Sequence, residues 1–333
     1  MRVMKRCAFI LPYFGKFNNY FKLFLKSCEN NPSFDWIIFT DDTEKYPYPA
    51  NVKVVYMTFD EIRCYIQEKF DIQISLPQPY KLCDFKPTYG YVFSDYLDSY
   101  QYWGHCDCDL LFGNLEKLLI PLLNQDYDKL FAVGHLTIYK NTPENNKKFM
   151  NLYHGRYLYQ EFLTVPSICW FDEEWRSDNI HSMFLESGAK VYCKSLEFNP
   201  SQKYAQFVQR EYSSEDRKYH EIRYKKALYF WQCGNIIQIV YHRKNSLAVN
   251  EYIYMHFQSR PMLQKVEDLE SGIIQILPNK FISKSKLPLN IKELKNYSYI
   301  SLSAYLFVLK NYWKRVTRKV KKIPILAEIK KGK

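Results

Sequence analysis

Short apolar runs alternate with amphipathic segments near the start of the chain, and this alternation restricts the fold more than any other feature. Apolar runs at 3–11, 34–42 and 52–57 predict three buried strands. Residues 17–31 and 59–70 carry apolar side chains at helical spacing and predict helices. Strands and helices of these lengths predict an α/β fold with a mixed, mainly parallel sheet flanked by helices.

The rest of the chain continues this pattern less regularly. Residues 80–97 predict a helix broken at Lys86-Pro87, with a second helix beginning at Pro87, because proline is favoured in the first turn of a helix. Strands or hairpins are predicted at 101–106, 129–141, 235–243 and 251–260, a helix at 114–125, and irregular structure with helical pieces at 141–235. One domain over residues 1–280, followed by a basic tail over 281–333, is the simplest organisation.

Positive charge is concentrated at the end of the chain. The formal net charge is +12, and residues 301–333 hold ten Lys or Arg against one acid, so the preceding 300 residues carry only +3. A nearly neutral body weakens the interpretation as a basic nucleic-acid-binding protein, so no nucleic-acid partner is expected. The chain also lacks the glycine-rich patterns of dinucleotide sites and P-loops.

Two aspartates, Asp107 and Asp109, follow a predicted strand in the otherwise apolar stretch YWGHCDCDLLFG. Ligands of open α/β sheets bind at the C-terminal ends of strands, where an extended backbone would point both side chains the same way. Paired carboxylates suit Mg²⁺ or Mn²⁺ bound together with substrate phosphates. Alternatively, both acids are solvated at a turn or cap the next helix. A zinc site from His105, Cys106 and Cys108 is disfavoured, because no second ligand cluster stands out.

Residues 81–113 carry a more specific pattern, K-x-x-D-x-K-P followed by W-G-x-x-D-x-D and a glycine. This pattern resembles the signature of a bacterial family of predicted glycosyltransferases. It is more distantly similar to the metal-dependent sugar transferases of the nucleotide-diphospho-sugar transferase (GT-A) superfamily, whose sheet is of Rossmann type. The resemblance covers about residues 5–265. It implies that Asp107 and Asp109 contact a divalent metal, Mn²⁺ or Mg²⁺, and that Asp107 also contacts the donor diphosphate.

Other expected donor-binding residues lie near these motifs or at the ends of the first strands. Lys81 and Lys86 are expected to contact phosphate, with solvated lysines as the alternative. Asp84 occupies a fixed position of the family pattern and is expected to hold Lys86 or the sugar. Two further groups are expected to lie against the nucleotide: Pro12, Tyr13, Phe14 and Gly15 after the first strand, and Asp41 and Asp42 after the second. For each of these residues, a turn or a helix cap is the alternative.

Two later segments complete the expected site. The strand at 251–260 ends at His256, a candidate third metal ligand, and Arg260 is a candidate phosphate contact. Transferases of this fold often supply such a late histidine and a nearby basic residue. Asp172 and Glu173 in WFDEEWRSDN are candidates for a catalytic base at an acceptor hydroxyl, with Trp170 and Trp175 available to stack on sugar rings. For His256, the alternative is a histidine packed against aromatic side chains. For Asp172 and Glu173, the alternative is the acidic first turn of a helix.

These features predict a metal-dependent glycosyltransferase that moves a sugar from a UDP- or GDP-sugar to a saccharide acceptor, in synthesis of a bacterial surface polysaccharide such as capsule or lipopolysaccharide. A nucleotidyl- or phosphotransferase of the same fold is the alternative enzyme, since the two aspartates suit any nucleotide diphosphate.

The tail predicts a basic amphipathic helix. Apolar residues recur at near-helical spacing from Leu302 to Val320, and lysines and arginines crowd the remaining positions. Such a helix is typical of binding to an anionic membrane surface, which would suit a lipid-linked acceptor; a helix docked on the body is the alternative. Nine cysteines without framework spacing favour reduced thiols. The expected location is therefore the cytoplasm, at the inner face of the cytoplasmic membrane.

Overall fold

The computed structural model describes residues 5–174, 177–201, 204–213, 216, 218–224, 226–242, 246–263 and 272–320. A mixed seven-stranded sheet forms the centre of the N-terminal half, with strand order β3-β2-β1-β4-β7-β6-β8. The pairs β1–β2, β2–β3, β1–β4 and β6–β8 are parallel, so the predicted mixed, mainly parallel sheet is confirmed. Its strands are β1 (Lys5–Pro12), β2 (Phe34–Thr40), β3 (Val52–Tyr56), β4 (Tyr100–Cys106), β6 (Lys129–Leu130), β7 (Leu136–Lys140) and β8 (Val191–Tyr192).

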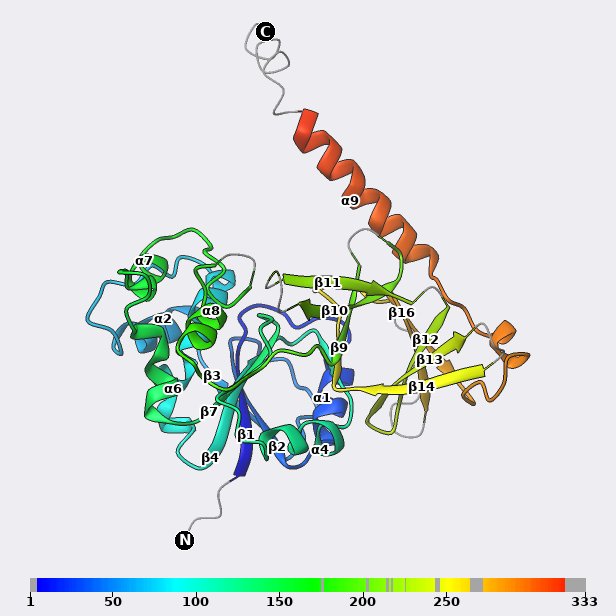
Figure 1. The fold of residues 1–333 in the computed structure, drawn as a ribbon, viewed down its shortest axis with the longest axis horizontal. Coiled ribbons are helices and arrows are strands. Elements are labelled where there is room, and N and C mark those ends of the chain that lie inside the picture. The colour runs from blue at the N-terminus through cyan, green and yellow to red at the C-terminus, as the bar shows by residue number, and fades with distance from the viewer. Residues whose placement is uncertain are drawn as a thin grey trace, which may run out of the picture.

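Helices cover both faces of this sheet, as Figure 1 shows. On β1, Ala8 and Ile10 pack into one core with α2, α3, α7 and α8, whereas Phe9 and Leu11 pack into another with α1, α4 and α5. Burial on both faces explains why the central strands are continuous apolar runs. The helices are α1 (Phe21–Glu29), α2 (Phe59–Gln67), α3 (Tyr89–Val92), α4 (Leu115–Leu118), α5 (Ile120–Leu123), α6 (Pro143–Lys147), α7 (Leu158–Leu163) and α8 (Ile180–Glu186), with 3₁₀ turns η2 (Ser94–Tyr96) and η3 (Lys148–Met150).

Two predicted helices differ from the structure at prolines. Residues 79–88 form a 3₁₀ helix, η1 (Pro79–Thr88), which includes Pro87, so α3 begins at Tyr89 instead of Pro87. Residues i and i+3 are eclipsed in a 3₁₀ helix, and η1 uses this geometry to pair Lys81 with Asp84. The single helix predicted at 114–125 is two one-turn helices, because Pro121 cannot donate a backbone hydrogen bond. Residues 129–141 form the hairpin β6–β7, one of the two alternatives.

Two further five-stranded sheets lie beside the first, and they take in strands from the last part of the segment 141–235, whose first part forms the expected helical pieces. Their pairings join strands far apart in sequence, such as β9 with β15 and β12 with β16, which local periodicity does not report. One sheet has the order β11-β10-β9-β15-β5, from β5 (Leu110–Phe112), β9 (Glu197–Pro200), β10 (Phe207–Ser213), β11 (Lys218–Arg223) and β15 (Tyr254–His256). The other has the order β14-β13-β12-β16-β17, from β12 (Ala227–Gln232), β13 (Asn235–His242), β14 (Ser246–Tyr252), β16 (Ile273–Leu277) and β17 (Lys280–Lys284).

After these sheets, η4 (Glu293–Asn296) leads to the last described helix, α9 (Leu302–Val320), which projects from the body in Figure 1. The domain boundary near residue 280 stays a prediction; β17, which starts there, pairs with β16. Among the residues that the structure describes, no helix combines the length and the apolar character needed to cross a bilayer.

Glu197 on β9 is buried, and it makes stability depend on pH. Burial raises the pKa of its carboxyl from 4.5 to about 7. The pKa of this carboxyl is higher in the folded protein than in the unfolded chain. The difference stabilises the fold at pH values below the pKa of the unfolded chain, and this stabilisation is lost as the pH rises through 7. We expect Glu197→Gln to remove that loss, so that from pH 4.5 to pH 8 the variant gains on the order of 3 kcal/mol over the wild type. Urea denaturation at both pH values measures it; parallel pH profiles for the two proteins would contradict it.

Candidate active site

A pocket opens at the C-terminal ends of β1 and β4. The chain continues from β1 to β2 and β3 on one side, while β4 lies on the other, so the pocket sits where the strand order reverses, the usual ligand site of an open α/β sheet. Its volume is about 420 Å³. Its lining includes Pro12, Tyr13, Phe14, Tyr80, Cys83, Lys86, Asp107, Asp109, Trp170, Asp172, Glu173 and Ser259. Trp175 lies outside the described residues.

Asp107 and Asp109 line this pocket, and His256 lies next to Asp109. One potential ligand atom from each residue lies within 4.8 Å of the other two. The pairing of β15 with β5 places His256 opposite Leu110, directly beside Asp109, and His256 Nε2 lies 3.4 Å from Asp109 Oδ2. The three residues proposed from the sequence as metal ligands therefore meet, although they come from distant segments.

Two details of this cluster fit a divalent cation. Asn199 Oδ1 lies 2.8 Å from His256 Nδ1 and can accept a hydrogen bond from it, so a bound cation would meet Nε2, the nitrogen that faces Asp109. Asp109 Oδ1 is buried and accepts no hydrogen bond from the described residues, so it retains coordinating capacity. Carboxylate oxygens with one neutral imidazole suit Mn²⁺, and carboxylates suit Mg²⁺. The site chemistry therefore fits a metal, and its identity stays open.

A tight turn fixes the orientation of Asp109. Ser259 donates its backbone N–H and its hydroxyl to Asp109 Oδ2. Gln258 and Ser259 both adopt positive φ, at 55° and 49°, a left-handed conformation that non-glycine residues rarely occupy. Burial alone would raise the pKa of Asp109, but His256 and the Ser259 donors lower it below its ordinary value, so the carboxylate is held ionised.

Lys86 is a positively charged residue in the lining of the pocket. Its ammonium group lies 2.8 Å from Asp107 Oδ1 and 3.4 Å from Asp172 Oδ2, and it donates to the Gly134 carbonyl at 2.7 Å. Burial alone would lower the pKa of Lys86, but the two carboxylates raise it well above its ordinary value. The lysine expected to contact phosphate thus lies in the pocket, and it links the aspartate pair to the candidate base.

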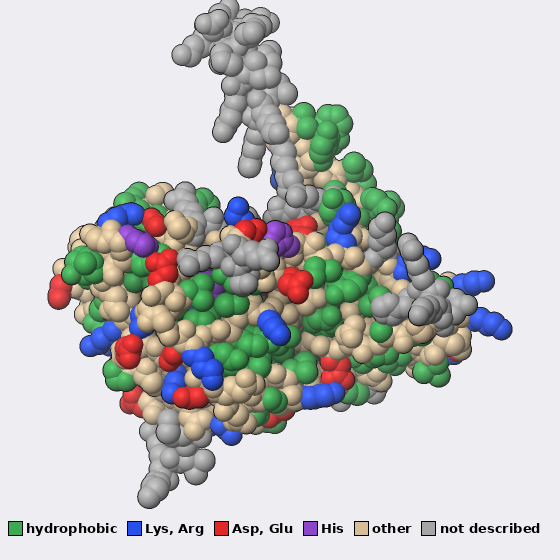
Figure 2. Space-filling model, in the orientation of Figure 1, with side chains coloured by type: hydrophobic (Ala, Val, Ile, Leu, Met, Phe, Trp, Pro, Cys, Tyr) green, Lys and Arg blue, Asp and Glu red, His purple; other side chains and the backbone are tan. Residues whose placement is uncertain are grey.

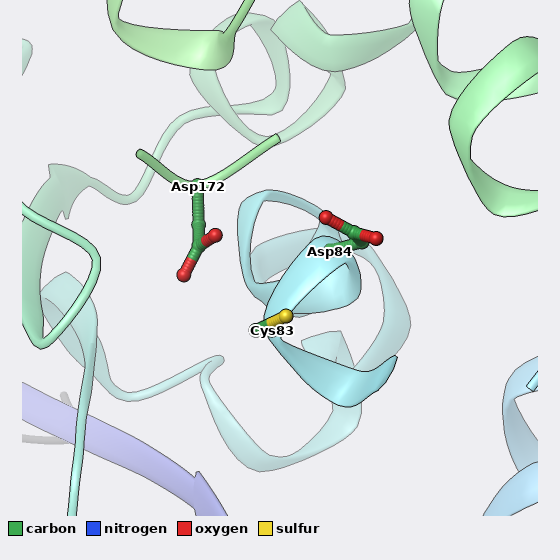
Figure 3. Close-up of side chains that lie close together, drawn as sticks. All are labelled: Cys83, Asp84 and Asp172. Atoms are coloured by element: carbon green, nitrogen blue, oxygen red, sulfur yellow. The ribbon is translucent and has the colours of Figure 1, made fainter. Parts of the chain in front are cut away.

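Asp172 and Glu173 also line the pocket, and Asp172 lies next to Lys86. Figure 3 shows Asp172 on its loop facing the turn of η1 that carries Cys83 and Asp84. A Cβ on Gly134 would lie 2.5 Å from Asp172 Oδ2 and 2.6 Å from Glu173 Oε1, so only glycine permits this approach. Burial raises the pKa of Asp172 well above its ordinary value despite the neighbouring Lys86. The higher pKa makes Asp172 a stronger proton acceptor once it is ionised.

The interior pair Lys81–Asp84 departs from the sequence expectation. Both side chains are fully buried, 2.7 Å apart, and Lys81 also donates to the carbonyls of Phe162 and Ser167. All three ammonium donors are thus used inside the protein, so in this arrangement Lys81 holds the fold together instead of meeting phosphate. Asp84 pairs with Lys81, not with Lys86.

Asp84 also holds the loop that carries the candidate base. Its carboxylate accepts the backbone N–H groups of Cys169 and Phe171, at 2.8 and 3.0 Å. Cys83, Asp84 and Asp172 have potential ligand atoms within 4.8 Å of one another, but the oxygens of Asp84 are already occupied. This trio therefore fits a metal less well than the cluster at Asp109.

Asp41 and Asp42 brace the loop after β1. Asp41 accepts the N–H of Gly15, whose φ is 103°, at 2.7 Å. Asp42 is buried, accepts the N–H of Phe17 and pairs with Lys16. Neither acid nor Gly15 is among the pocket-lining residues, so both aspartates shape the loop that carries Tyr13, and nucleotide contact by them stays a prediction.

Arg260 is also buried away from the pocket lining, with 2% of its surface exposed. Its Nη2 donates to the carbonyl of Ser201 at 2.9 Å, and the guanidinium stacks on the Phe307 ring of α9 at 4.3 Å. Burial lowers its pKa to about 10. Its Nε and Nη1 are buried and meet no acceptor among the described residues, so the phosphate contact expected from the sequence stays a prediction. In this arrangement Arg260 connects the turn at Ser259 to α9.

Several site residues carry no recognisable signal in the sequence. His135 stacks on His256 with ring centroids 4.2 Å apart, and its backbone carbonyl accepts the N–H of Asp107. Its Nδ1 meets the Tyr254 hydroxyl at 2.9 Å. Burial lowers the pKa of His135 well below its ordinary value, so the ring is neutral. Neither His135 nor Asn199 belongs to a local motif, since only the packing of distant strands gives them a role.

The fold and the site define an α/β protein with a carboxylate–histidine cluster in a pocket at the C-terminal ends of its central strands. The sequence matches the family of unknown function DUF6625 over residues 9–285, and the chain therefore belongs to that family. No curated protein matches it.

Solved structures of glycosyltransferases show a distant likeness. Two structures of the galactosyltransferase LgtC, one with donor and acceptor sugar analogues and one of an active-site mutant, match with TM-scores of 0.32 and 0.33. Each has 8% identity and covers 59% of this chain and 76% of LgtC. Mouse xyloside xylosyltransferase 1 matches with TM-score 0.32 and 8% identity, over 59% of this chain and 86% of its own. Likenesses this weak establish neither activity nor ligands here.

Proposed function

We propose that this protein is a metal-dependent glycosyltransferase that moves a sugar from a nucleotide-diphosphate donor to a saccharide acceptor. The observation that carries the proposal is the cluster of Asp107, Asp109 and His256, whose two aspartates line, together with Lys86, a pocket at the C-terminal ends of β1 and β4. A pocket of about 420 Å³ has the size of a small-ligand site.

Asp107, Asp109 and His256 are the residues that would hold Mn²⁺ or Mg²⁺. A divalent cation there would offset the negative charge that develops on a diphosphate leaving group. Lys86 stays protonated, adds positive charge to the same wall and holds Asp107 and Asp172 in place. Tyr13 offers a partly exposed aromatic ring beside the site, where a UDP or GDP base would stack.

The acceptor reacts on the side of Asp172 and Glu173. Its hydroxyl oxygen attacks the anomeric carbon, the bond between that carbon and the diphosphate oxygen breaks, and the hydroxyl proton moves to one of these carboxylates. The nucleoside diphosphate then leaves. Tyr80 and Trp170 also line this pocket and are exposed, so they offer aromatic faces to the acceptor sugar. The wider role that we propose, in bacterial capsule or lipopolysaccharide synthesis, rests on the resemblance of the motifs at 81–113.

A panel of UDP- and GDP-sugars tests the activity. We expect one donor to raise the melting temperature only with Mn²⁺ or Mg²⁺ present, and to be hydrolysed slowly to the free sugar and nucleoside diphosphate. Release of nucleoside monophosphate, inorganic phosphate or pyrophosphate would instead identify a nucleotidyl- or phosphotransferase. Absence of stabilisation by every donor at millimolar concentration would refute the proposal.

The same assay tests the base. Asp172→Asn or Glu173→Gln should lower turnover by roughly 10²–10⁴-fold while donor stabilisation persists. Glu68→Gln, at an exposed position on the end of α2, is the matched control and should leave turnover unchanged. If both pocket variants keep full turnover, neither carboxylate is the base.

A further inference from the structure

The C-terminal helix α9 (Leu302–Val320) carries large apolar side chains that the body leaves uncovered. Figure 2 shows hydrophobic side chains gathered along the described part of this projecting helix. All are at least half exposed: Leu302 (75%), Tyr305 (50%), Leu306 (58%), Leu309 (53%), Tyr312 (60%) and Trp313 (62%). Exposed apolar groups of this size, collected on one element, mark a contact surface.

This apolar stripe lies opposite the face that docks α9 on the body. With about 100° per residue, Leu302, Leu309 and Trp313 fall on one side of the helix, and Ala304 and Phe307 fall on the other. Ala304 is fully buried, and the Phe307 ring stacks on Arg260. The helix thus already has a body-facing side, and its apolar stripe faces away from the body.

The charge of the tail indicates which kind of partner binds the apolar stripe. Residues 301–333 carry ten Lys or Arg and one acid, a net charge of +9. Within the described part of the helix, Lys310 and Lys314 are exposed, and Lys310 flanks the stripe. Two copies of such a segment would repel each other, whereas an anionic surface attracts it. Tyrosine and tryptophan among the leucines are typical of side chains placed at a lipid–water boundary.

We propose that α9 lies in the surface of an anionic lipid bilayer, with the stripe from Leu302 to Trp313 in the acyl boundary and its lysines at the headgroups. The helix is about 28 Å long, which suits a helix parallel to the membrane plane. Arg260 follows Ser259 in the turn that fixes Asp109, so the surface helix is anchored next to the pocket. This inference does not depend on the proposed glycosyl transfer.

Vesicle flotation of the full chain tests the proposal. The wild type should bind vesicles of phosphatidylcholine with one-third phosphatidylglycerol at least tenfold more tightly than vesicles of pure phosphatidylcholine. Leu306→Glu with Leu309→Glu should lower binding to the anionic vesicles by tenfold or more. Leu152→Glu with Leu289→Glu, at positions that are 60% and 80% exposed elsewhere, is the matched control and should bind like the wild type.

A second pair of substitutions separates charge from apolar contact. Lys310→Gln with Lys314→Gln should weaken binding to anionic vesicles by about tenfold and leave the melting temperature unchanged. Equal binding to both vesicle types, or undiminished binding of the glutamate variant, would overturn the proposal. A concentration-dependent dimer in ultracentrifugation, abolished by the same glutamates and without vesicle binding, would assign the stripe to a second copy of the chain instead.

Discussion

Replacing Asp109 with asparagine is expected to lower metal-dependent transfer by about 10²–10⁴-fold and to remove most of the stabilisation by metal as well. Asparagine keeps the shape and one oxygen, so it can still accept from Ser259, but it removes the charge that faces His256 at 3.4 Å. The substitution also changes the buried position of Asp109 Oδ1, which accepts no hydrogen bond from the described residues: this position then holds either an NH₂ group or an uncharged oxygen.

The metal itself gives a second measurement of the same variant. In the wild type, Mn²⁺ at about a hundred times its dissociation constant should stabilise the fold by about 2.7 kcal/mol, and most of this should disappear in Asp109→Asn. Asp71→Asn makes the same chemical change at an exposed position and should alter neither measurement. An Asp109→Asn protein that still responds fully to Mn²⁺ would exclude Asp109 as a metal ligand.

Replacing Lys86 with methionine is expected to destabilise the metal-free protein by about 3–5 kcal/mol, because two carboxylates then lose their shared cation in a largely buried setting. The melting temperature should fall by roughly 5–10 °C. Mn²⁺ should restore more stability to this variant than it adds to the wild type, since a cation held by Asp107 relieves the same repulsion.

Lys16→Met is the matched control for this loss. Lys16 also pairs with an aspartate, the buried Asp42, but the Lys16 side chain is 73% exposed and Asp42 keeps the backbone N–H donors of Phe17 and Glu44 when the lysine is removed. A surface pair contributes about 0–1 kcal/mol, and the control should melt close to the wild type. If Lys86→Met and Lys16→Met lose the same amount of stability, the charge of Lys86 contributes no more to stability than the charge of an exposed lysine.

Local sequence patterns located the central strands and the aspartate pair well. β1, β2 and β4 are apolar runs because both faces of the sheet are covered, and this burial leaves a direct trace in sequence. Asp107 and Asp109 were recognisable because carboxylates directly after such a run are chemically unusual. Local patterns also gave helical spacing from residue 302 onward, where α9 is found.

The same patterns did not report how deeply a side chain is buried. Lys81 and Lys86 both stand in K-x-x-D-x-K-P, yet Lys81 is enclosed by Asp84 and two carbonyls, whereas Lys86 reaches Asp107. Arg260 looked like a phosphate contact, but it is covered by Phe307. Spacing along a helix fixes which face a side chain occupies and does not say what covers that face.

The sequence by itself determined the layered α/β architecture, the position of the two aspartates at a strand end, and the charge of the tail, because each follows from local periodicity or composition. Only the tertiary structure decided that His256 lies beside Asp109, that Asn199 orients it, and that Lys86 joins Asp107 to Asp172. The reason is physical: β5 pairs with β15 across more than a hundred residues of chain, and no local propensity encodes such a long-range register.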